Sequence, residues 1–151
     1  MEGKYCIGLD YGTLSARAAL VSVETGEEKA SLVYEYQNSV IDDVLSETAV
    51  KIPLDCAYQD PQDYLAALAA LLSGIWKKAQ VDPANIIGIG INFTSCTLLS
   101  LDQDLVPMCF HEKYRHDPQS WAKLWKHHGA QAEADRINQI AQSRNENFLR
   151  R

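Results

Sequence analysis

The stretch Gly8-Leu9-Asp10-Tyr11-Gly12-Thr13-Leu14-Ser15-Ala16-Arg17 joins two short apolar segments through a polar turn. Glycine in its centre allows a positive φ, so we predict a tight turn between strands at residues 4–10 and 16–23. Residues 24–27 predict a second hairpin turn, and a third strand follows at residues 30–36. Three sequential strands joined by tight turns predict an antiparallel meander.

A long polar connection over residues 38–59 leads to the most strongly predicted helix in the chain. Asp60 is suited to cap it and Pro61 to occupy its first turn. Apolar residues then recur at helical spacing as far as Trp76. Residues 86–91, with the sequence Ile-Ile-Gly-Ile-Gly-Ile, predict a fully buried strand of the parallel type.

The last third of the chain predicts a hairpin and a second helix. Residues 98–101 and 106–110 flank a polar turn and predict the hairpin. We predict a helix from Pro118 onward with Trp121, Leu124 and Trp125 on one face, continuing through two isoleucines after a bend near the glycine at 129. These elements together predict an α/β fold.

Composition and missing motifs exclude several classes of protein. The net charge of −6 argues against general nucleic-acid binding, and no apolar run is long enough to span a membrane. The sequence contains neither GxGxxG nor GxxxxGK[ST], which excludes the common dinucleotide and P-loop sites. The four cysteines form no CxxC pair, which fits free thiols in a reducing compartment and predicts a cytoplasmic protein.

The first polar turn has the residue types that a phosphate site needs. Asp10 ends a strand and can hold Mg²⁺ through water. Gly12 leaves backbone N–H groups accessible, and the hydroxyls of Thr13 and Ser15 can donate to phosphate oxygens. Arg17 adds positive charge for a transferring phosphoryl group. The same residues also suit an ordinary hairpin, and the turn alone leaves both interpretations open.

A second polar segment, Asn-Phe-Thr-Ser-Cys-Thr at residues 92–97, follows the predicted buried strand. Its hydroxyls could simply satisfy the loop backbone, and Cys96 could be a small buried apolar residue. Trp121 and Trp125 could both belong to a core stripe. The neighbouring histidines His127 and His128 point to different faces of a helix, so we expect no chelating pair from them.

Three segments resemble the FGGY carbohydrate kinases, and within them the ribulokinases. They are GLDYGTLSAR at residues 8–17, INFTSCTLLSLD at residues 91–102, and YRHDPQSWAKLWKHHGAQAEADRIN at residues 114–138. The resemblance implies a ribonuclease-H-like (actin-like ATPase) domain, a mixed sheet with flanking helices. It also implies that residues 1–151 are a truncated N-terminal part of the sugar-binding domain. The rest of that domain and the nucleotide-binding domain would then be absent.

The resemblance implies transfer of the ATP γ-phosphoryl group to the terminal hydroxyl of ribulose, within arabinose catabolism. ATP and Mg are the expected cofactors, and the sugar and ATP the expected partners, with no nucleic acid or membrane. The implied phosphate and Mg-binding residues are Asp10 (the Mg ligand, through water), Gly12, Thr13, Ser15 and Arg17. The implied substrate-binding residues are Asn92, Thr94, Ser95, Cys96, Trp125 and Lys126.

Two departures from the family pattern qualify this expectation. Ribulokinases typically carry an acidic residue where this chain has Asn92, although some related glycerol kinases have Asn there. The family's general base would lie beyond residue 151, so we expect the isolated chain to have little or no kinase activity and to self-associate, as a homo-oligomer, through exposed apolar surface. Alternative functions are a stand-alone sugar-binding or interaction module, or a kinase for xylulose or glycerol.

Overall fold

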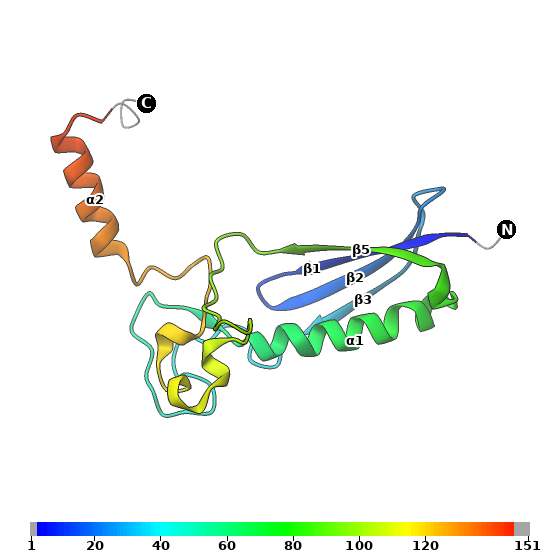
Figure 1. Cartoon of the computed structure of the whole chain (residues 1–151), viewed down its shortest axis with the longest axis horizontal. Coiled ribbons are helices and arrows are strands. Elements are labelled where there is room, and N and C mark those ends of the chain that lie inside the picture. The colour runs from blue at the N-terminus through cyan, green and yellow to red at the C-terminus, as the bar shows by residue number, and fades with distance from the viewer. Residues whose placement is uncertain (1–2, 147–151) are drawn as a thin grey trace.

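The computed structural model describes residues 3–146 and is built around one four-stranded mixed sheet (Figure 1). Its strands are β1 (Tyr5–Tyr11), β2 (Ser15–Ser22), β3 (Glu28–Glu35) and β5 (Ile86–Phe93), in the spatial order β3-β2-β1-β5. The first three strands pair antiparallel, and β5 pairs parallel to β1. The predicted meander and the parallel type of the later strand are therefore confirmed.

Helix α1 (Pro61–Ala79) covers one face of this sheet (Figure 1). The Asp60 side chain caps it by accepting a hydrogen bond from the backbone N–H of Gln62 at 2.8 Å, as predicted. The main core lies between α1 and strands β1 to β3, because alternate strand residues point toward the helix. Its fully buried members are Ile7, Leu9, Tyr11, Ala16, Ala18, Leu20, Ala30, Tyr36, Ala67, Leu71 and Ile75.

Strand β5 is less buried than its sequence predicted. Ile89, Ile91 and Phe93 point to the α1 side of the sheet, yet their exposed fractions are 52%, 58% and 50%. The reason is that α1 packs on β2 and β3, so within residues 3–146 no helix covers the β5 edge. The prediction of a fully buried strand is wrong for this chain.

A second, smaller unit lies beside the N-terminal end of α1 (Figure 1). It contains the two-stranded antiparallel sheet of β4 (Tyr58–Gln59) and β6 (Ala122–Lys123). Four short 3₁₀ turns occur in the described chain: η1 (Pro83–Asn85), η2 (Met108–Phe110), η3 (Glu112–Tyr114) and η4 (Pro118–Ser120). A separate core fills this unit and comprises Ile41, Leu45, Ile52, Tyr58, Cys109 and Trp121.

The predicted helix from Pro118 is wrong. Pro118 begins only the 3₁₀ turn η4, and the chain then enters β6 because Lys123 exchanges backbone hydrogen bonds with Leu98 at 2.8 and 3.0 Å. The helix that follows, α2 (Gln131–Ser143), carries the two predicted isoleucines but starts later. The predicted hairpin after residue 98 is reduced to one bridge between Leu101 and Pro107, since η2 replaces its second strand.

No helix in the part of the chain that the structure describes is long and apolar enough to cross a membrane.

Candidate functional site

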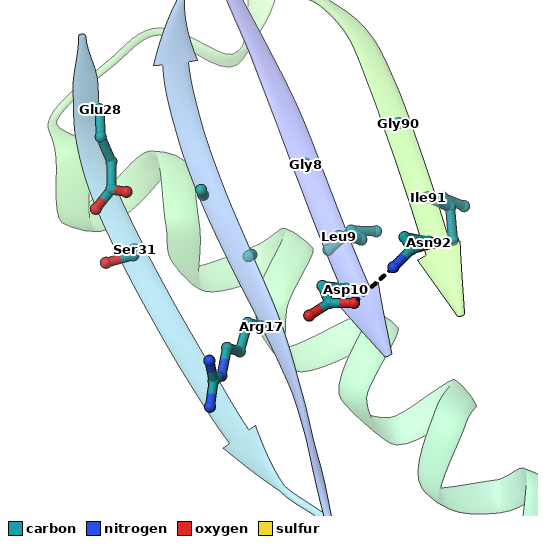
Figure 2. Close-up of a pocket in the computed structure, with 11 residues that line it drawn as sticks. Gly8, Leu9, Asp10, Arg17, Glu28, Ser31, Gly90, Ile91 and Asn92 are labelled. Carbon is teal, nitrogen blue, oxygen red and sulfur yellow. Dashed lines mark hydrogen bonds between the residues drawn. The ribbon is translucent and has the colours of Figure 1, made fainter. Parts of the chain in front are cut away.

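Polar side chains from three neighbouring strands gather on the sheet face that α1 leaves open. Figure 2 shows Asp10 on β1, Arg17 on β2 and Asn92 on β5 projecting from this face near one end of the strands. They line an open hollow of about 560 Å³ whose floor includes Gly8 and Gly90. Because glycine has no side chain, the floor of the hollow is backbone, which lets a ligand approach the sheet closely.

Asp10 is the centre of this group. It faces Arg17 across the antiparallel pair and Asn92 across the parallel pair. The Asn92 amide Nδ2 donates to Asp10 Oδ1 at 3.0 Å (Figure 2). Within residues 3–146, no hydrogen bond or ion pair involves the Arg17 guanidinium or the second Asp10 oxygen. One cationic and one anionic group are therefore free to bind ligand atoms on the same face.

The turn after β1 is as tight as predicted, but for a different reason. The Gly12 N–H donates to the Ser15 carbonyl at 2.9 Å, and a Cβ at Gly12 would lie 3.0 Å from that oxygen. Glycine is needed here for this close approach, while the positive φ of 72° occurs in the second hairpin, at Gly26.

Thr13 is held from two sides by residues far away in the sequence. Its carbonyl accepts a hydrogen bond from Gln59 Nε2 at 2.7 Å, and its hydroxyl accepts one from Trp125 Nε1 at 3.2 Å. The structure thus brings Trp125, a predicted sugar contact, to Thr13, a predicted phosphate contact. Gln59 was not predicted as a site residue, because a polar residue just before a helix cap carries no signal of a contact 46 residues away.

The predicted loop at residues 92–97 starts two residues later in the structure, because Asn92 and Phe93 still belong to β5; residues 94–97 follow the strand, beside β1. The Thr94 N–H donates to the Tyr11 carbonyl at 3.0 Å, and its hydroxyl pairs with that of Thr97 at 3.1 Å. The Tyr11 and Phe93 rings stack with centroids 4.4 Å apart, which anchors the loop to the sheet. Cys96 is exposed with φ of 61°, so its alternative reading as a buried apolar residue is wrong.

The two tryptophans have different environments. Trp121 is 3% exposed and belongs to the second core, whereas Trp125 is 56% exposed. The core interpretation therefore holds for Trp121 only. Lys126 forms an ion pair with Asp42, with Nζ and Oδ2 3.6 Å apart, so the Lys126 ammonium group points toward Asp42.

The residues present fit magnesium bound with water and phosphate rather than a cage of protein ligands. Among residues 3–146 no group of three His, Cys, Asp or Glu side chains could hold a metal ion. Asp10 provides a single accessible carboxylate. Mg²⁺ keeps several waters and is usually bound by one or two carboxylates together with substrate phosphates. The carboxylate of Asp10 is compatible with this ion, and its role as a magnesium site stays a prediction.

Known proteins resemble this chain along its whole length, although no family model matches it. The ribulokinase of Geobacillus thermodenitrificans is 48% identical over 151 residues, which is all of this chain and 27% of that protein. The ribulokinase of Bacillus licheniformis is 49% identical over 136 residues, covering 90% of this chain and 25% of the relative. The chain therefore spans about a quarter of the length of the curated relatives it matches.

Solved structures give the same fold. A gluconate kinase from Lactobacillus acidophilus superimposes with a TM-score of 0.62 over 95% of this chain and 23% of its own, at 21% identity. A xylulose kinase from the same organism gives a TM-score of 0.61 over 93% of this chain and 23% of its own, also at 21% identity. These likenesses confirm the expected α/β, actin-like fold class.

Proposed function

We propose that this chain, a homologue of the ribulokinases over its whole length, forms the first part of the sugar-binding domain of an ATP-dependent carbohydrate kinase. In this proposal the enzyme transfers the γ-phosphoryl group to the terminal hydroxyl of ribulose. The observation that carries the proposal is the convergence of Asp10, Arg17 and Asn92 at one end of three adjacent strands, beside the turn at residues 12–14.

Each residue of the phosphate side has a chemical role that its position supports. The free oxygen of Asp10 would hold waters of a bound Mg²⁺ ion, while Asn92 fixes the orientation of the carboxylate. Arg17 supplies positive charge on the same face. Thr13 and Ser15 offer hydroxyl and backbone donors at the turn. A magnesium ion held here through Asp10 would supply positive charge against the charge that develops on the transferring group.

In this proposal the sugar side is formed by the loop at residues 94–97, which follows Asn92 on β5, and by Trp125. An exposed indole can pack its face on the C–H surface of a sugar, and the N–H that now bonds Thr13 lies at the phosphate side of that ring. Thr94, Ser95 and Cys96 are placed on the loop that follows β5. Lys126, in the second unit, would reach the sugar after its exposed ion pair with Asp42 opens. Opening this pair costs little free energy because exposed ion pairs are weak.

The proton of the sugar hydroxyl must pass to a general base, and we propose that this base lies outside the present chain. The isolated chain should then bind ligands weakly and show little or no turnover.

A chimaera tests the proposed function. The matching segment of the Geobacillus thermodenitrificans ribulokinase is replaced by this chain, and ATP-dependent phosphorylation of ribulose, xylulose and glycerol is compared. We expect turnover with ribulose above the other two, and a fall in kcat of about 100-fold or more on Asp10→Asn, the scale for loss of one charge-stabilising group. Asp104→Asn, at an exposed turn residue that does not line the hollow at Asp10, is the matched control.

A folded chimaera with no ribulose turnover would overturn the assignment to ribulose. A higher turnover with xylulose or glycerol would instead identify that sugar or polyol as the substrate. Robust turnover by the isolated 151-residue chain would show that the base lies within it.

A further inference from the structure

Gln59 is a buried amide with both of its polar ends in use. Its exposed fraction is 1%. Nε2 donates to the Thr13 carbonyl at 2.7 Å, and Oε1 accepts from the Tyr64 hydroxyl at 2.8 Å. Because a carbonyl only accepts and the hydroxyl here donates, the two partners fix which way round the amide lies. Burial raises the pKa of Tyr64, so the phenol keeps its proton throughout the neutral range.

The bond to Thr13 also fixes the direction of the next backbone N–H. A trans peptide is planar, and its C=O and N–H point in opposite directions. When Gln59 holds the Thr13 carbonyl inside the protein, the Leu14 N–H must point away from Gln59. No described residue accepts a hydrogen bond from that N–H. The turn thus presents an unused donor whose direction is set from within the core.

The two residues that hold Thr13 come from one small element. Gln59 belongs to β4, and Trp125 follows β6, its antiparallel partner. The same β6 is bridged through Lys123 to Leu98, which follows the loop at residues 94–97. The β4–β6 sheet is therefore the common support of the phosphate turn and of both sugar-side segments.

We propose that Gln59 is a positioning residue for the phosphate turn: it fixes the Thr13–Leu14 peptide so that the turn's backbone donors face the nucleotide phosphate. This inference rests on the proposed kinase function. Tyr64 acts one step further away by orienting the Gln59 amide. Neither residue needs to touch ATP or sugar. Because both act through the phosphate turn, their substitution should alter the affinity for the nucleotide rather than the affinity for the sugar.

The first test uses the 151-residue chain and needs no activity. Gln59→Met keeps the length and apolar volume of the side chain but leaves the Thr13 carbonyl without its donor. Amide exchange by NMR is followed at Gly12 and Tyr36, whose N–H groups bond across the turn to Ser15 and Leu14 at 2.9 and 3.0 Å. We expect exchange at these two amides to accelerate about tenfold, the equivalent of one lost hydrogen bond, while amides of β2 and β3 remain unchanged.

Two further variants separate positioning from general stability. Tyr64→Phe removes only the group that orients the amide, so it should give the same pattern with a smaller acceleration and be non-additive with Gln59→Met. Gln62→Met, at an exposed position in the first turn of α1, should have no effect. Equal acceleration over the whole sheet, or no change at Gly12 and Tyr36, would overturn the proposal.

The second test measures the ribulokinase chimaera. Gln59→Met should raise the KM for ATP about tenfold and leave the KM for ribulose within about twofold. An active chimaera with an unchanged KM for ATP would reject the role of Gln59 and leave the kinase assignment intact. An inactive parent chimaera would reject the kinase assignment, while the exchange experiment still decides whether Gln59 positions the turn.

Discussion

The Asn92 amide donates to Asp10 Oδ1 at 3.0 Å, and the two residues are register partners on neighbouring parallel strands. Position 92 therefore faces the carboxylate that we assign to magnesium. A carboxylate at this position would place two negative charges at hydrogen-bond distance, a pair that is unfavourable alone and favourable around a divalent cation.

Asn92→Asp should make the stability of the chain depend on magnesium. Without divalent ions at neutral pH we expect a loss of about 1 kcal/mol, the scale of two surface charges about 4 Å apart in water. Millimolar Mg²⁺ should restore it, as followed by urea unfolding. Asn92→Ala, which only removes the hydrogen bond, should show no magnesium effect. If both variants respond alike to Mg²⁺, position 92 does not face the ion.

Asp63 ties the end of β3 to the first turn of α1. It is 4% exposed, and its two oxygens accept hydrogen bonds from the backbone N–H groups of Gln37 and Asn38 at 3.1 and 3.0 Å. Asp63→Ala should lower the free energy of unfolding by about 2–4 kcal/mol, because two part-buried hydrogen bonds to a charged acceptor are lost. Urea denaturation measures this, with Gln62→Ala as the exposed control. A loss below about 1 kcal/mol would contradict the structure.

The helix cap Asp60 should give the chain a recognisable pH dependence. Burial raises the pKa of its carboxyl, and the nearby Asp63 adds to the rise. A raised folded-state pKa contributes stability that is present below the unfolded pKa, near 4, and is lost as pH rises through the folded pKa. Asn also caps helices but does not titrate.

The free energy of unfolding of the wild type, relative to Asp60→Asn, should therefore increase as the pH is lowered from 7 to about 3.5. Urea titrations at a series of pH values would measure the difference. A difference that stays constant or shrinks on acidification would show that Asp60 is not desolvated in the folded chain.

The cysteines should differ sharply in reactivity. Cys109 is 2% exposed, and burial raises the pKa of its thiol to about 12, whereas Cys96 is exposed. A thiol reagent at pH 8 should modify Cys96 first and Cys109 only after unfolding, because the thiolate is the reactive form. Peptide mass spectrometry identifies the sites, and Cys96→Ser should remove the fast phase. Rapid native labelling of Cys109 would refute the second core.

Elements with local signals were predictable from the sequence. The meander follows from turn residues between short apolar segments, and α1 follows from its cap, its first-turn proline and its apolar spacing. Strand β5 was placed correctly, but its burial depended on which helix covers it, and α1 packs on the other strands. The apolar composition of residues 86–91 alone could not predict which strands α1 covers.

Long-range contacts explain the errors and the omission. The segment around Trp121 has helical spacing, yet its backbone bonds to Leu98 and its ring enters a core formed by earlier residues. Gln59 contacts Thr13 across 46 residues. The sequence grouped Asp10 with Arg17 but assigned Asn92 to the sugar; the pairing of β5 with β1, which brings Asn92 to Asp10, is a long-range contact. Whether these residues bind phosphate and magnesium remains a prediction.

The anchoring of Thr13 by Trp125 has a consequence for the order of folding. The meander closes through near neighbours, but this bond joins residues 112 positions apart, and such closures are slow to form. We expect β2 to acquire structure early in refolding and the turn at residues 12–14 to become rigid last. Pulse-labelled amide exchange should then show protection at Ala18 before protection at Gly12. During synthesis, the turn would lack its bond to Trp125 until that residue emerged from the ribosome.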